Sequence, residues 1–295
     1  MQEIADGVLI ETELRGVTLG AIRTEDGFVL IDTPTFPTDA ALWRKTLQSY
    51  ADLPILAIIM LDSHRDRLLG ASWFNPNILI AHRLTLDIVS SLSNSYVSTI
   101  ANLSATNAVE RARLMNGKIL HPTITFSDTL RLHFGDLVIH LQHRPGPTSG
   151  SIWVYLEKEE IVFVGDSLVV NTPPYLASPY SQAWLSALNE LEDRWPNAQI
   201  VTGRGALAKI EDAWPLRTYL KLARDNVKTL YENRRPLSEI TALITQLQAI
   251  YPPPHEYELD EIQQRIRTGL QFIYNEFREA DLKTQQALFT RYDRI

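Results

Sequence analysis

Side chains able to bind a metal or move a proton gather directly after two apolar runs of the sequence. The run Ile55–Leu61 is followed by Asp62, His64 and Asp66, and a later run is followed by Asp166. Loops at the ends of strands are where proteins build their sites, so these residues are the candidates for chemistry. Carboxylates and an imidazole can together bind one Zn²⁺, Mn²⁺ or Fe²⁺ ion when water completes the coordination shell.

Two arginines accompany these acids. Arg67 follows Asp66 directly, and Arg204 comes shortly after the predicted strand Gln199–Thr202. A guanidinium is always charged and has no lone pair for a metal, but it can pair with a carboxylate through two parallel hydrogen bonds. The two arginines are therefore candidate partners of the acids and cannot be metal ligands.

The composition excludes several other chemistries. The 295 residues include no cysteine, which rules out disulfides, thiolate ligands and a cysteine nucleophile. The sequence has no Gly-X-Ser-X-Gly elbow and no phosphate loop of the Walker type. A net charge of −7 argues against a nucleic-acid partner, because neutralising phosphates needs a basic surface.

The N-terminal residues lack the basic start and apolar run of a signal peptide. The longest apolar run, Leu53–Leu61, has about half the length that a membrane-spanning helix needs. We therefore expect a soluble, cytoplasmic protein with no membrane partner.

Strands and helices alternate along the first two-thirds of the chain. Short apolar runs bounded by turn signals predict strands, and apolar residues at helical spacing predict helices. Strands are predicted at Gly7–Leu14, Gly16–Arg23, Phe28–Asp32, Ile55–Leu61, Asn77–Ile80, Thr129–Phe134, Leu137–Gln142, Ser151–Leu156, Ile161–Val164 and Gln199–Thr202. Helices are predicted at Thr38–Tyr50, from Arg83, over most of Ser90–Lys118 and at Ser181–Trp195. Two separate sets of strands with helices between them indicate an α/β sandwich.

The last third of the chain is predicted to be helical. Of 13 glycines, only Gly269 lies beyond Gly205, so turn signals are scarce there. Helical patterns run from Trp214 to Asn233, from Pro236, and from Asp260, which can cap its helix with Gln263 three residues on. Their apolar stripes are typical of core or dimer packing.

Five segments, in order, resemble motifs of the metallo-β-lactamase superfamily, in its hydrolase branch related to glyoxalase II. Residues 28–34 resemble the family's opening strand, and residues 61–70 resemble its loop Thr-His-X-His-X-Asp-His-X-Gly-Gly. Residues 145–151 resemble Pro-Gly-His-Thr-X-Gly-Ser, residues 162–166 resemble Phe-X-Gly-Asp, and residues 203–205 resemble Gly-His-Gly. The resemblance covers about residues 6–207. It implies the α+β fold class, with a four-layer αβ/βα metallo-β-lactamase sandwich over 1–207 and a helical C-terminal region over 208–295.

The departures from the family's pattern concern its metal ligands. The family holds two metals with seven side chains, mostly histidines. The corresponding positions here are Asp62, His64, Asp66, Arg67, Pro147, Asp166 and Arg204. The resemblance places both arginines at the second metal, where two fixed cations would oppose a dication. We therefore expect no dinuclear zinc.

Two interpretations of the remaining residues stay open. In the first, Arg67 and Arg204 replace the second metal's charge by pairing with the acids, and the protein needs no cofactor. In the second, Asp62, His64 and Asp166 hold a single Zn, Mn or Fe ion.

Two functions correspond to these interpretations. The first is a pseudoenzyme whose cleft is kept as a binding site for a small anionic ligand, with Arg65 and Arg144 on loops that reach the cleft in the family. Both arginines can equally be solvated loop residues. The alternative is a mononuclear-metal hydrolase of an ester, thioester or lactone that uses Asp62, His64 and Asp166, with Asp66 as its catalytic residue. In related proteins C-terminal helices line the cleft or form a homodimer contact, and either role is open here.

Overall fold

A computed structural model describes residues 1–93, 95–176, 178, 180–251 and 259–292, and for residues 284–292 it describes the backbone alone. The chain divides into two compact units. The sandwich unit comprises Met1–Arg144, Gly150–Val170 and Trp195–Ile210, and the helical unit comprises Pro145–Ser149, Asn171–Arg194 and Glu211–Ile295.

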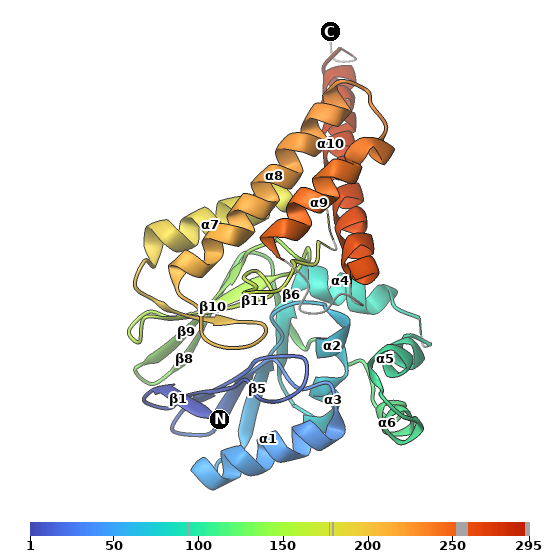
Figure 1. The fold of residues 1–295 in the computed structure, drawn as a ribbon. Coiled ribbons are helices and arrows are strands. Elements are labelled where there is room, and N and C mark those ends of the chain that lie inside the picture. Colours follow the sequence, from blue (N-terminus) through green and yellow to red (C-terminus); the bar gives the residue numbers. More distant parts are fainter. Residues whose placement is uncertain (94, 177, 179, 252–258, 293–295) are drawn as a thin grey trace. The chain divides into compact units, whose positions relative to one another are not determined.

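The sandwich unit contains two mixed β-sheets (Figure 1). In the first sheet, β1 to β4 pair antiparallel and β4 to β7 pair parallel, in chain order. Its strands are β1 (Gln2–Ala5), β2 (Val8–Glu11), β3 (Leu19–Arg23), β4 (Phe28–Ile31), β5 (Ile55–Ile59), β6 (Leu79–His82) and β7 (Ile124–Phe126).

The second sheet has the order β12-β11-β10-β9-β8. Its strands β8 to β11 pair antiparallel, and β11 pairs parallel with β12. They span β8 (Thr129–Phe134), β9 (Leu137–His143), β10 (Ile152–Leu156), β11 (Ile161–Gly165) and β12 (Gln199–Thr202). The predicted hairpin at Gly135-Asp136 joins β8 to β9.

The two sheets share one apolar core, and the first sheet is also buried on its other face. Val29 and Ile59 from the first sheet belong to the same cluster as Phe163 from the second. The intervening residues, such as Leu30, belong to a second cluster with Trp43 of a helix. Because both faces of β4 are buried, its sequence is continuously apolar instead of alternating.

Helices cover that outer face of the first sheet. They are α1 (Pro37–Tyr50), α3 (Gly70–Phe74), α4 (Arg83–Ser91), α5 (Tyr96–Ser104) and α6 (Ala108–Leu114). The short helix α2 (Arg65–Leu68) follows β5 and carries part of the candidate site.

The helical unit packs α8 (Ala213–Glu232) against α7 (Ser181–Arg194), α9 (Thr241–Ile250) and α10 (Leu259–Tyr292). Between α7, α8 and α10, Glu276 pairs with Arg224 at 2.9 Å and accepts a hydrogen bond from the Ser181 backbone N–H at 3.1 Å. Its carboxylate thereby neutralises Arg224 and caps the N-terminus of α7. No described helix is both long enough and apolar enough to span a membrane.

The expected fold class, an α+β sandwich of two mixed sheets with a helical C-terminal region, is confirmed. Differences are local. β1 and β7 were not predicted, because each is short and has partly exposed residues. α10 begins at Leu259, so Asp260 lies in its first turn instead of capping it, and the Gln263 side chain donates to Gln248. The proposed domain boundary after residue 207 stays a prediction.

Candidate metal site

Parallel strand pairs bring the candidate residues of the sandwich unit together. Asp32 follows β4 and Asp62 follows β5, its parallel neighbour. Asp166 follows β11, and Arg204 follows β12, which is again parallel to it. The carboxyl ends of parallel neighbours lie at the same sheet edge, where ligand sites form in α/β proteins. Asp32 has a left-handed backbone (φ 55°), and its Oδ1 accepts the Leu61 N–H at 2.9 Å.

Arg67 lies at the centre of the acids. Its side chain is completely buried and its Nε donates to Asp32 Oδ2 at 2.8 Å. Nη2 donates to Asp166 Oδ1 at 2.9 Å, and Nη1 donates to Asp66 Oδ1 at 3.2 Å. Asp62 Oδ1 lies 3.7 Å from Nε. We call Asp32, Asp62, Asp66 and Asp166 the carboxylate cluster, and Arg67 is its buried counter-ion.

Arg204 pairs with two members of the cluster from its open side. Its Nη2 lies 2.6 Å from Asp66 Oδ2 and 2.9 Å from Asp166 Oδ2, and its side chain is 35% exposed. This is the pairing that charge replacement requires. The preceding residue must be glycine, because a Cβ on Gly203 would lie 2.2 Å from Asp166 Oδ1. Gly203 was identified in the sequence as part of the segment that resembles Gly-His-Gly, but its close approach to Asp166 was not predicted.

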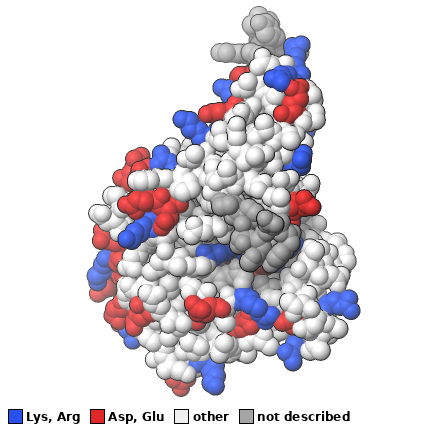
Figure 2. All heavy atoms as spheres, viewed as in Figure 1, with Lys and Arg blue, Asp and Glu red and all other residues white. Residues whose placement is uncertain are grey.

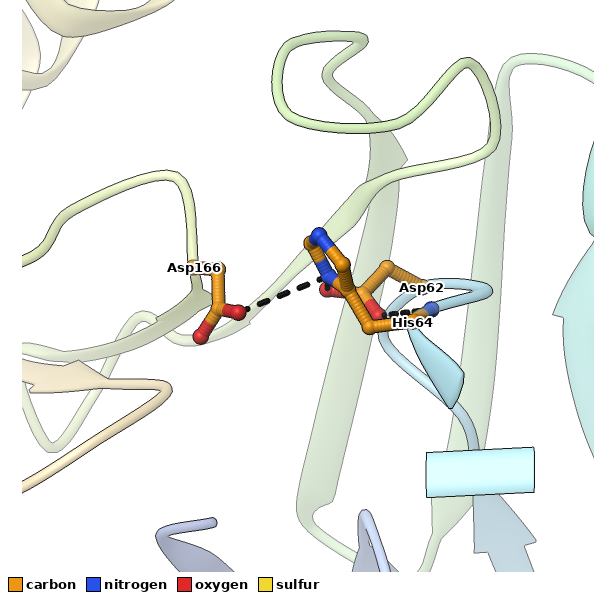
Figure 3. A group of neighbouring side chains, drawn as sticks. All are labelled: Asp62, His64 and Asp166. Carbon is orange, nitrogen blue, oxygen red and sulfur yellow. Dashed lines mark hydrogen bonds and ion pairs between the residues drawn. The ribbon is translucent and has the colours of Figure 1, made fainter. Parts of the chain in front are cut away.

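Asp62, His64 and Asp166 point toward one another (Figure 3), and their ligand atoms all lie within 4.8 Å of one another. His64 Nδ1 is 3.0 Å from Asp62 Oδ2 and 3.4 Å from Asp166 Oδ2. The His64 backbone N–H donates to Asp62 Oδ1 at 2.8 Å, whereas the neighbour of the buried Oδ2 is the His64 ring nitrogen. Two carboxylates and one imidazole that converge in a buried site form a donor set that fits one metal ion.

The pKa values in the site follow from burial and charge. Burial raises the pKa of Asp166, but Arg67, His64 and Arg204 outweigh it and hold that pKa well below its usual range. The Asp62 pKa is lowered in the same way, against burial, by Arg67 and His64. Burial alone would lower the pKa of His64, but Asp62 and Asp166 raise it above its ordinary value. Burial raises the pKa of Asp32 to about 6.

The site carries an excess of negative charge. Its four carboxylates meet two guanidiniums, so two negative charges remain when His64 is neutral and one remains when it is protonated. The Asp66 side chain is 21% exposed and the Arg204 side chain is 35% exposed, and the others are more deeply buried. Such an excess attracts a cation.

The remaining predicted residues lie elsewhere. Arg65 is exposed at the start of α2 and has no ion pair with the cluster in the described residues. Arg144 donates to the His143 carbonyl at 3.0 Å, and its guanidinium lies 6.0 Å from the Trp153 ring. Pro147 belongs to the helical unit. Asp32, the last residue of a predicted strand, accepts a hydrogen bond from the Leu61 backbone N–H and also pairs directly with Arg67.

Comparison with known proteins defines the class. The profile of the Metallo-beta-lactamase superfamily matches residues 13–198. This chain belongs to the metallo-beta-lactamase superfamily, which confirms the superfamily assignment drawn from its motifs. Among curated proteins none matches it significantly.

Solved structures share the fold. A metallo-beta-lactamase from Pontibacter korlensis has 18% identity and a TM-score of 0.58 over 75% of this chain and 97% of its own. A metallo-beta-lactamase family protein from Thermus thermophilus has 15% identity and a TM-score of 0.64 over 95% of each chain. The inverting sec-alkylsulfatase Pisa1 from Pseudomonas has 14% identity and a TM-score of 0.71 over 93% of this chain, which spans about half (49%) of the sulfatase.

Proposed function

We propose that this chain keeps one of the superfamily's metal positions and uses it to hydrolyse an ester, thioester or lactone. Asp62, His64 and Asp166 would hold the ion. The single observation that supports this most strongly is the convergence of one ligand atom from each of these three residues, all within 4.8 Å of one another in a site of negative excess. Two carboxylates and one imidazole suit Zn²⁺, Mn²⁺ or Fe²⁺.

The second metal position is taken by guanidinium charge in this proposal. Arg67 contacts all four carboxylates of the cluster, and Arg204 contacts Asp66 and Asp166. A fixed cation can supply the charge of a metal, but it supplies no open coordination position. We therefore propose a mononuclear site.

Asp66 has the role of general base in the proposed reaction. It is the most exposed carboxylate of the cluster, at 21%, and Arg204 and Arg67 fix both its oxygens. From this place it can accept the proton of a water molecule whose oxygen bonds to the carbonyl carbon, and return that proton to the alcohol or thiol that leaves when the C–O or C–S bond breaks. A metal ion, when bound, polarises the substrate carbonyl and acidifies water. Arg67 and Arg204 keep Asp66 oriented through that proton transfer.

The second candidate function is a metal-free binding site for a small anionic ligand. Its support is the partial exposure of the Arg204 side chain and the exposure of Arg65. The charge of the carboxylate cluster argues against this function, because its four acids neutralise both Arg67 and Arg204. A small anion would have to be held by Arg65 or Arg144 outside the cluster. We therefore favour the metal site.

Metal binding tests the proposal directly. Protein freed of metal by dialysis against a chelator is titrated calorimetrically with Zn²⁺ and with Mn²⁺, and bound metal is counted by mass spectrometry. We expect about one ion per chain, and an affinity reduced by at least about 100-fold in Asp62→Asn, because loss of a direct ligand should cost more than the 10–100-fold typical of groups that only support a ligand. Asp136→Asn is the matched control, because Asp136 is exposed in the β8–β9 turn.

Turnover of a p-nitrophenyl ester, a thioester and a lactone is then compared with and without the bound ion. Loss of turnover in Asp66→Asn with unchanged metal content would support its role as base. If the wild type binds no metal, and acetate or phosphate instead raises its melting temperature, the anion-binding function replaces the hydrolase.

A further inference from the structure

Arg204 joins three segments of the sandwich unit. Its Nη2 pairs with Asp66 and Asp166, whereas its Nη1 donates to the backbone carbonyl of Gly16 at 2.5 Å. Gly16 lies in the β2–β3 loop, residues 12–18, and is exposed with a left-handed backbone (φ 92°). One guanidinium therefore connects a metal-ligand candidate to a surface loop.

The β2–β3 loop is anchored on both sides of Gly16. Arg15 pairs with Asp39 at 3.1 Å and with Glu110 at 2.5 Å, and Thr18 donates its N–H to the Gly203 carbonyl at 2.9 Å. These anchors do not involve the carboxylate cluster. The Gly203 carbonyl, which anchors Thr18 at the end of the loop, also accepts a hydrogen bond from Arg67 at 3.4 Å, whereas the contact of Gly16 with Arg204 reaches the middle of the loop.

Arg204 and a metal ion require the same oxygen. Asp166 Oδ2 lies 3.4 Å from His64 Nδ1, on the side where the three candidate metal ligands converge. The same oxygen accepts a hydrogen bond from Arg204 Nη2 at 2.9 Å. Arg67 pairs with Asp166 chiefly through the other oxygen, Oδ1, at 2.9 Å. A dication at Oδ2 would stand beside the Arg204 charge and repel it, because like charges at such distances interact strongly in a partly buried site.

We propose that Arg204 is a built-in competitor of the metal ion and that it couples metal occupancy to the order of the β2–β3 loop. This inference rests on the proposed metal site. Without a metal ion, Arg204 holds Asp66, Asp166 and the Gly16 carbonyl together. A metal ion that takes Asp166 Oδ2 displaces the guanidinium, and Gly16 loses its partner. Because coupling is reciprocal, an ordered loop lowers metal affinity by the same factor by which metal lowers loop order.

The experiment combines metal titration with hydrogen exchange on the full chain. Zn²⁺ or Mn²⁺ alone is titrated into the wild type, Arg204→Gln and the control Arg65→Gln, which removes an equal charge from the exposed start of α2. We expect the metal affinity of Arg204→Gln to be at least about tenfold higher than that of the wild type, and the metal affinity of Arg65→Gln to lie within about twofold of the wild-type value. Saturating metal should speed amide exchange in residues 12–18 of the wild type. In Arg204→Gln that exchange should be fast before metal is added and should change little afterwards.

Arg204→Lys separates charge from geometry and serves if the glutamine variant does not fold. It keeps the positive charge, but an ammonium group lacks the fork that spans the carboxylates and the Gly16 carbonyl together. We expect wild-type metal affinity within about threefold, with fast exchange in the loop.

The outcomes separate this inference from the function on which it rests. If neither the wild type nor Arg204→Gln binds metal, the proposed metal site is wrong. If both bind with equal affinity, the metal site stands and the competition is refuted. If metal binds more tightly to Arg204→Gln but leaves exchange in residues 12–18 of the wild type unchanged, the coupling to the loop is refuted.

Discussion

Replacing Arg67 with methionine should remove the counter-ion of the carboxylate cluster while leaving a side chain of similar length. The Arg67 side chain is completely buried and lies within 4 Å of carboxylate oxygens from all four acids. Removing one partner of a buried ion pair typically costs about 3–5 kcal/mol, because the remaining charge is left unpaired. We expect a cost at the upper end of that range, since several carboxylates lose their partner at once.

Scanning calorimetry is the appropriate assay, because it resolves the two units if they unfold separately. A cost of this size corresponds to a fall of about 10–20 °C in the melting temperature of a unit of this size. Arg65→Met, on the exposed side of the same helix, should change stability by no more than about 0.5 kcal/mol.

The pH dependence identifies charge as the cause. The pKa of Asp166 is depressed in the folded protein, so its contribution to stability is present above the unfolded pKa of 3.8 and is lost as the pH falls through the folded pKa. Without Arg67 that contribution largely disappears, so the gap between Arg67→Met and wild type should be largest near pH 7 and narrow below about pH 4. A variant as stable as wild type, or an equal gap at both pH values, would show that Arg67 does not neutralise the cluster.

Three further outcomes follow from the structure. Gly203→Ala should lower the free energy of unfolding by about 1–3 kcal/mol and weaken metal binding, because the new Cβ would lie 2.2 Å from Asp166 Oδ1. Urea unfolding measures the stability and calorimetric titration measures the metal affinity. A variant unchanged in both would mean that the turn adjusts freely. The Thr106 backbone N–H and Arg15 hold the pKa of Glu110 at about 2, so the anchor of the β2–β3 loop should weaken as the pH falls from 4.5 toward 2. Protection of residues 12–18 against exchange, relative to the intrinsic rate at each pH, should fall in that window in wild type, and already at pH 7 in Glu110→Gln. Glu276→Gln should destabilise the helical unit by about 1–3 kcal/mol, because the part-buried Arg224 loses its ion-pair partner. The control is Glu279→Gln, since Glu279 is exposed on the same helix. Equal melting temperatures for Glu276→Gln and the wild type would refute a structural role for the pair.

Local sequence patterns were enough to predict most of the strands and to predict that the polar residues following three of them would lie close together. Apolar runs placed β4, β5 and β11, and the polar residues after them, Asp62, His64 and Asp166, converge within 4.8 Å as the motifs implied. Their function as metal ligands stays a prediction.

The contacts that were not predicted depend on long-range register. The bond from Arg204 to Gly16 joins residues 188 positions apart, and the pair of Asp32 with Arg67 depends on how α2 begins after β5. Local spacing carries no information about either. The charge excess of the cluster also needed the structure, because the sequence alone did not place Asp32 beside Arg67.

The burial of Arg67 also bears on how this protein responds to metal supply in a cell. A metal ion must be captured from a pool that rises and falls, and proteins folded around one lose structure when a chelator removes it. A guanidinium is synthesised as part of the chain and is present in every copy at fixed stoichiometry. The fold should therefore survive dialysis against a chelator, and a metal ion bound at Asp62, His64 and Asp166 should add stability only by mass action, in proportion to the logarithm of its free concentration.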